Sequence, residues 1–83
     1  MPKPHGESGQ KNLIAKQLRI LRAKRHMSQR GLAMEFQLRG YDIDKNVITR
    51  IENNQRYVSD IELQELLEIF KLTYDELMNM DVE

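Results

Sequence analysis

Apolar residues recur at intervals of three and four along most of the chain, a spacing typical of amphipathic helices. The first such stretch covers about residues 12–25 and carries Leu13, Ile14, Leu18 and Leu21. Arg22 lies one position past this apolar stripe, close enough to bury the aliphatic part of its side chain. The pattern therefore predicts a first helix from about Asn12 to Arg25.

A second helix is predicted from Ser28 to about Leu38. Ser28 is a preferred N-cap residue. One face of this helix carries the apolar residues Leu32, Ala33 and Phe36. Gly40 marks its end, because glycine adopts the left-handed conformation after a helix without steric cost.

A third helix is predicted at about residues 44–53, with Asp44 as its N-cap. Its buried stripe consists of Val47, Ile48 and Ile51, and its polar face carries Lys45, Asn46, Thr49 and Arg50. This mixture of long hydrogen-bonding side chains suits the edges of DNA bases better than it suits a plain solvated surface. A polar surface helix in a small bundle is the alternative interpretation.

Two capping boxes predict two further helices. Ser59 and Glu62 begin the fourth, which continues through Leu63, Leu66, Leu67, Ile69 and Phe70. Thr73 and Glu76 begin a short fifth helix with Leu77 and Met78 on its apolar side. No stretch shows sustained alternation or an Asn-Gly hairpin signal. We therefore expect an all-α fold of five short helices around one core.

The 83 residues suffice for one small domain, and the absence of cysteine excludes disulfides, thiolate zinc sites and a cysteine nucleophile. No apolar run reaches the length of a membrane span, and the N-terminus lacks the apolar centre of a signal peptide. A cytoplasmic protein is expected. Residues 1–11 are predicted to form a flexible arm, residues 12–80 the folded domain and residues 81–83 a short tail.

Charge is distributed unevenly although the formal net charge is zero. Residues 1–56 contain twelve Lys and Arg against five Asp and Glu, a net +7, whereas residues 57–83 contain one against eight, a net −7. This asymmetry indicates one face for a polyanion and one face turned away from it. The alternative is that solvated helices merely differ in charge.

Signals for other chemistry are absent. His5 and His26 lack the neighbouring carboxylates or cysteines that a metal site needs. Residues 42–46 begin like a calcium loop, but Val47 replaces its glycine and Asn53 its final glutamate. No nucleophile–base pair or phosphate-binding glycine loop is present. The sequence predicts no cofactor, no metal and no enzymatic activity.

Three groups of residues resemble the Cro/repressor-type helix-turn-helix family, also called the xenobiotic-response-element or lambda-repressor-like type. They are Gln29-x-x-Leu32-Ala33, the run Ile48-Thr49-Arg50-Ile51-Glu52-Asn53, and the run from Leu72 to Leu77. The resemblance covers about residues 12–80. It implies a five-helix bundle and, for most members, binding to operator DNA as a symmetric dimer.

The resemblance also implies a role for each matching position. Gln29 is expected to contact a phosphate and brace the third helix, and Arg22 to pair with Glu52. Asn53 and Arg56 are expected to hold the DNA backbone. The side chains that would face the major groove are Lys45, Asn46, Thr49 and Arg50, whose donors and acceptors match those of base edges.

The chain departs from the family pattern at two places. About five extra residues, at 37–41, predict a longer second helix and a wider linker, with Ile43 as the apolar plug of the turn. This insertion offers Arg39 as a further contact to the DNA backbone and gives Tyr41 a new contact. Gly31 stands where a capping-box glutamate is usual, which weakens the start of the second helix by about 1 kcal/mol.

The preferred hypothesis is a sequence-specific double-stranded DNA-binding transcriptional regulator that acts as a homodimer. A repressor is favoured because no activation or ligand domain is evident in a chain of this length. The acidic C-terminal part, with Tyr74, Met78 and Met80, is the expected dimer surface. The alternative function is an antitoxin or a protein-interaction adaptor that uses the same fold and binds a protein partner.

Overall fold

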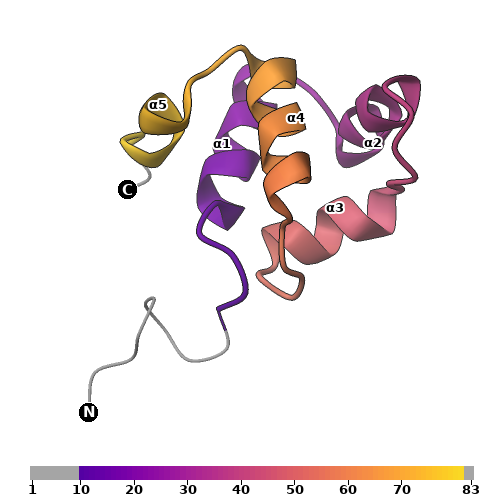
Figure 1. Cartoon of the computed structure of the whole chain (residues 1–83), viewed down its shortest axis with the longest axis horizontal. Coiled ribbons are helices and arrows are strands. Elements are labelled where there is room, and N and C mark those ends of the chain that lie inside the picture. Colours follow the sequence, from indigo (N-terminus) through magenta and orange to yellow (C-terminus); the bar gives the residue numbers. More distant parts are fainter. Residues whose placement is uncertain (1–9, 82–83) are drawn as a thin grey trace.

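A computed structural model describes residues 10–81 as a bundle of five helices (Figure 1). Their bounds are α1 Ala15–Lys24, α2 Gln29–Leu38, α3 Lys45–Glu52, α4 Asp60–Phe70 and α5 Tyr74–Met78. Between residues 10 and 81 there is no strand, which confirms the expected all-α fold. Most of the predicted arm, residues 1–9, and the last two residues of the predicted tail lie outside the described residues.

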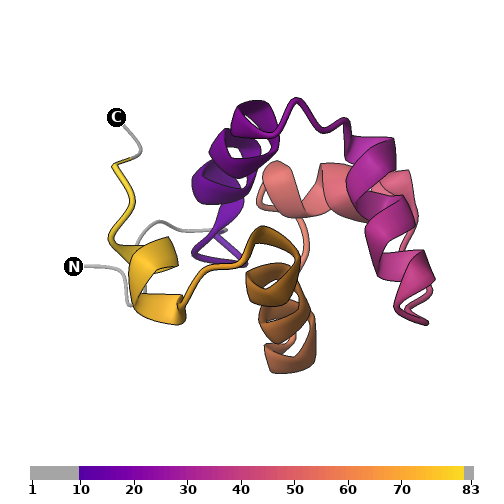
Figure 2. The ribbon, with the colours of Figure 1, turned by 90° about the horizontal axis from the view of Figure 1, so that it is seen from above.

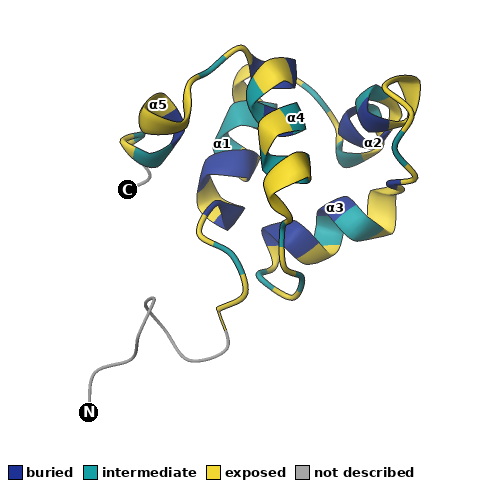
Figure 3. Cartoon of the chain, viewed as in Figure 1, coloured by how far each residue is buried: buried dark blue, intermediate teal, exposed yellow. Residues whose placement is uncertain are grey.

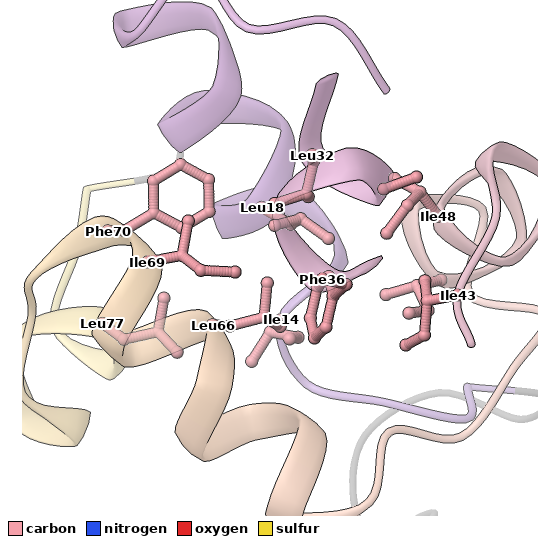
Figure 4. Close-up of a cluster of buried hydrophobic side chains, with 12 residues drawn as sticks. Ile14, Leu18, Leu32, Phe36, Ile43, Ile48, Leu66, Ile69, Phe70 and Leu77 are labelled. Carbon is pink, nitrogen blue, oxygen red and sulfur yellow. The ribbon is translucent and has the colours of Figure 1, made fainter. Parts of the chain in front are cut away.

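All five helices contribute to one core. Seen from above, α5 lies at one end of the bundle and the pair α2 and α3 lies at the other (Figure 2). The buried faces of the helices point inward, whereas the first turn of α3 is exposed (Figure 3). The side chains that fill the centre, shown in Figure 4, include Leu18, Leu32, Phe36, Ile48 and Phe70.

The first helix begins later than the sequence predicted. Asn12 and Leu13 precede α1, which starts at Ala15. The Asn12 side chain instead donates to the carbonyl oxygens of Ile51, at the end of α3, and of Arg56, in the turn after it. Leu13 is 52% exposed rather than buried. The long-range hydrogen bonds of Asn12 therefore override the local helical pattern at this end.

The other helix starts follow the predicted caps. Ser28 accepts from the amide of Gly31 at 2.8 Å, and Asp44 accepts from Val47 at 3.0 Å. The capping boxes at the starts of α4 and α5 are both formed. Four of the five helices thus begin where a local side-chain acceptor is available to bond an otherwise unpaired amide.

Among the described residues, no helix is long and apolar enough to cross a membrane. The same part of the chain contains no group of three or more His, Cys, Asp or Glu residues arranged to hold a metal ion.

Candidate nucleic-acid interface

The linker between α2 and α3 spans residues 39–44 and is fixed by several contacts. Gly40, with φ of +91°, ends α2 as predicted, because its amide bonds to Gln37 and the next amide, of Tyr41, bonds to Phe36. The Tyr41 and Phe36 rings pack edge to face with centroids 6.1 Å apart. Ile43 is only 3% exposed, which confirms its predicted role as the apolar plug.

The insertion is also attached to α4. One guanidinium nitrogen of Arg39 lies 3.1 Å from Glu65 and 3.2 Å from Glu68. The Tyr41 hydroxyl donates to Glu65 at 3.2 Å. Burial of the hydroxyl and its hydrogen bond to Glu65 raise the pKa of Tyr41. These contacts give the extra residues partners within the fold, and the expected contact of Arg39 with the DNA backbone stays a prediction.

α3 buries Ile48 and Ile51 and turns its polar side outward. The side chains of Lys45, Asn46 and Arg50 are exposed and form no hydrogen bond or ion pair within residues 10–81. They are therefore free to bind an external ligand.

Thr49 differs from its neighbours on this face. Its hydroxyl donates to the Gln29 side-chain oxygen at 2.8 Å and also lies 3.0 Å from the Lys45 carbonyl oxygen. A base contact by Thr49 would therefore use its methyl group or an oxygen lone pair rather than its proton.

Glu52 joins three helices at the inner end of α3. Its carboxylate, 3% exposed, accepts from Arg22 Nε at 2.5 Å and from a second Arg22 nitrogen at 2.8 Å. Gln29 donates to the same carboxylate at 3.0 Å. The hydrogen bonds to Glu52 raise the pKa of Arg22. The predicted Arg22–Glu52 pair and the bracing of α3 by Gln29 are confirmed, whereas the phosphate contact of Gln29 stays a prediction.

The two residues expected to hold the DNA backbone after α3 differ in their surroundings. Asn53 is exposed, and its side chain makes no hydrogen bond to any described residue. Arg56 is held by Glu62 through two hydrogen bonds of 2.9 and 3.0 Å. These bonds raise the pKa of Arg56 and lower that of Glu62. Any phosphate contact by Arg56 therefore has to compete with a carboxylate.

Two arginines that lie beside α3 were not predicted as site residues. Arg30, in the first turn of α2, is exposed and without a partner among the described residues. It lines a hollow of about 500 Å³ together with Met34, Gln37, Lys45 and Asn46. Arg19 donates to the backbone oxygen of Glu52 at 2.6 Å. The position of Arg30 next to Gln29 at a helix start could have indicated a functional role for it. No local sequence pattern indicates the hydrogen bond of Arg19 to Glu52.

A helix-turn-helix family model matches residues 18–77, which include most of the folded part from α1 to α5. No curated protein and no solved structure matches the chain.

Proposed function

The chain belongs to the Cro/C1-type helix-turn-helix family, and we propose that it is a sequence-specific transcriptional regulator that reads double-stranded DNA with α3. Members of this family bind DNA and are typically non-catalytic. The all-α bundle of five helices is the lambda-repressor-like fold that the family implies.

The observation that carries the proposal is the contrast between the two sides of α3. Its inner side is fixed by Ile48, Ile51 and Glu52, all at most 3% exposed. Its outer side presents Lys45, Asn46 and Arg50 without partners among the described residues. Lys and Arg match the acceptors of guanine, and Asn matches the donor and acceptor of adenine. A rigid helix with free side chains of these types suits the major groove.

Contacts to the DNA backbone come from the residues that flank α3. Gln29 and Arg30 lie in the first turn of α2, where unpaired amides and the helix dipole favour a phosphate. Asn53 follows α3 directly. Arg39 and Arg56 are proposed as further backbone contacts that exchange a carboxylate for a phosphate when DNA binds.

We propose a homodimer that reads two half-sites about 34 Å apart. The dimer surface would be the face around α5, where Tyr74 is 49% exposed and Leu13 52%. Both line a hollow of about 190 Å³ with Val58, Leu63 and Met78. Most of the residues that line it are apolar, and a surface of this kind suits contact with a second copy better than contact with DNA. Met80, which packs against the core next to it, completes this dimer surface.

Repression is the proposed outcome of binding, because a domain that occupies an operator excludes other proteins from it. Neither a cofactor nor a metal is needed for this function. Binding of a fluorescent duplex, measured by anisotropy over a range of salt concentrations, tests the DNA proposal. Affinity that falls steeply as salt rises is expected, because counterions are released from the phosphates. Absence of binding at low salt would contradict the proposal and would favour a protein partner instead.

A further inference from the structure

The segment before α1 is bound to the turn after α3 by side chains that the proposed DNA contacts do not use. Asn54 Oδ1 accepts from the backbone amides of Lys11 at 2.6 Å and of Asn12 at 2.9 Å. In return, Asn12 Nδ2 donates to the carbonyl oxygens of Ile51 and Arg56, both at 3.0 Å. These four hydrogen bonds join segments about 40 positions apart in the sequence. We refer to them as the Asn12–Asn54 latch.

Both asparagines fit their positions closely. Asn12 Oδ1 also accepts from the amide of Ile14 at 3.0 Å, so both ends of its side-chain amide are used. Asn54 has φ of +61°, in the left-handed region that asparagine adopts more readily than most residues. Few other residue types could therefore form these contacts at positions 12 and 54.

The latch adds a hydrogen bond at the C-terminal end of α3 to those made by the backbone amides of the following turn. The last carbonyls of a helix have no amide ahead of them and need other donors. Here Asn12 bonds to the Ile51 carbonyl, and Arg19 bonds to the Glu52 carbonyl at 2.6 Å. The opposite end of α3 is held separately by the Asp44 cap. Each end of α3 is thus held by its own set of contacts.

Contacts at both ends of α3 oppose a tilt of the helix about its buried side. α3 has eight residues and is therefore about 12 Å long. Release of one end would move the side chains of that half most, and hydrogen bonds weaken steeply once their distance and angle depart from the preferred geometry. Arg50 lies in the half next to the latch, whereas Lys45 and Asn46 lie next to the Asp44 cap.

We propose that Asn12 and Asn54 are positioning residues for base recognition: the latch fixes the C-terminal half of α3, and with it the base preference read by Arg50. This inference rests on the proposed function. It assigns to two residues outside the proposed DNA contacts an effect on one part of the recognised sequence. Loss of the latch should therefore change specificity at particular base positions rather than weaken all of them equally.

Two substitutions of Asn54 separate the hydrogen bonds from the backbone conformation. Asn54→Gly keeps the left-handed conformation, which glycine adopts freely, but removes the acceptor. Asn54→Asp keeps an acceptor oxygen at the same place and serves as the matched control. On the other side of the latch, Asn12→Asp keeps the acceptor for Ile14 and removes both donated bonds.

Selection from a randomised duplex pool, performed for the wild type and each variant, tests the effect on specificity. For Asn54→Gly and Asn12→Asp we expect at least about a fivefold loss of preference at the base positions that Arg50→Ala also relaxes. Preference at the positions relaxed by Lys45→Ala or Asn46→Ala should be retained, and Asn54→Asp should select as the wild type does. Unchanged preferences, or an equal loss at every position, would overturn the proposal.

Amide hydrogen exchange of the free protein gives a readout that needs no DNA. In Asn54→Gly, the amides of Asn53 and Gln55, bonded to Thr49 and Arg50, should exchange about fivefold faster. The amide of Leu63 in α4 is the internal control: its exchange rate should change only as far as the global stability of the variant changes. Unchanged exchange at Asn53 and Gln55 would overturn the latch itself, whereas a wild type that selects no sequence would instead overturn the proposed function.

Discussion

Arg22 in α1 and Glu52 at the end of α3 form a two-point ion pair that ties the first helix to the proposed reading helix. Glu52 is almost completely buried, and the Arg22 side chain is 18% exposed. Loss of the arginine would leave a buried carboxylate whose remaining side-chain partner is Gln29. The position of α3 and the stability of the domain should therefore depend on the same contact.

The first prediction concerns this pair. Arg22→Gln should lower the free energy of unfolding by about 3 kcal/mol, because an unpaired buried charge is costly. Arg39→Gln, which removes the more exposed pairs with Glu65 and Glu68, should cost about 1 kcal/mol or less. Urea denaturation of both variants gives the comparison. Equal losses would show that burial does not distinguish the two ion pairs.

The second prediction concerns acid stability. The hydrogen bonds from Arg56 lower the pKa of Glu62 below its ordinary value of 4.5. The stability that this carboxylate contributes is therefore complete above the ordinary pKa and is lost as the pH falls through the lowered one. Glu62→Gln can keep the capping box but not the charge. The stability difference between wild type and Glu62→Gln should shrink between about pH 6 and about pH 3.

The control for this prediction is the same comparison in an Arg56→Gln background. In that background, the stability difference caused by Glu62→Gln should be smaller at neutral pH and should change less on acidification. A difference that is independent of pH with Arg56 present would contradict the assigned cause.

The third prediction concerns Arg30. If this free cation contacts one phosphate, Arg30→Gln should reduce the slope of log affinity against log salt concentration by about 0.9. The matched control is Lys71→Asn. Lys71 is the single Lys or Arg of residues 57–83. Its backbone is in the left-handed conformation, which asparagine tolerates. Its slope should equal that of the wild type. An unchanged slope for Arg30→Gln would place this arginine outside the DNA contact.

The fourth prediction concerns the dimer. Tyr74→Ser should weaken self-association, measured by sedimentation equilibrium, by about tenfold or more because aromatic side chains dominate protein interfaces. Leu38→Ser is the control, since Leu38 is 79% exposed and lies outside the proposed dimer surface. If the Leu38 variant dissociates and the Tyr74 variant does not, the proposed dimer surface is wrong.

The sequence predicted those features that depend on residues close together in the chain. The caps at Ser28, Asp44, Ser59 and Thr73 each need an amide three positions away, so the pattern contains both partners. The helix stop at Gly40 is equally local. The Arg22–Glu52 pair is not local, and its prediction depended on the family resemblance.

Features that depend on distant backbone groups were not predictable in this way. Asn12 reads as the start of a helix, yet it bonds to carbonyls about 40 residues away. Arg39 was expected to contact the DNA backbone. Its partners in the fold, Glu65 and Glu68, lie far away in the sequence, and no sequence pattern indicates that they lie beside it. Side chains with several donors have many possible partners, and only the packed arrangement of the helices selects among them.

Sequence selection by the wild-type protein from a randomised duplex pool at moderate salt tests the central claim most directly. An enriched inverted repeat, with half-sites about 10 base pairs apart, is the predicted result. Lys45→Ala, Asn46→Ala and Arg50→Ala should then each relax a defined base position. Retention of duplexes with no enriched sequence, or no retention at all, would contradict the claim that α3 reads DNA.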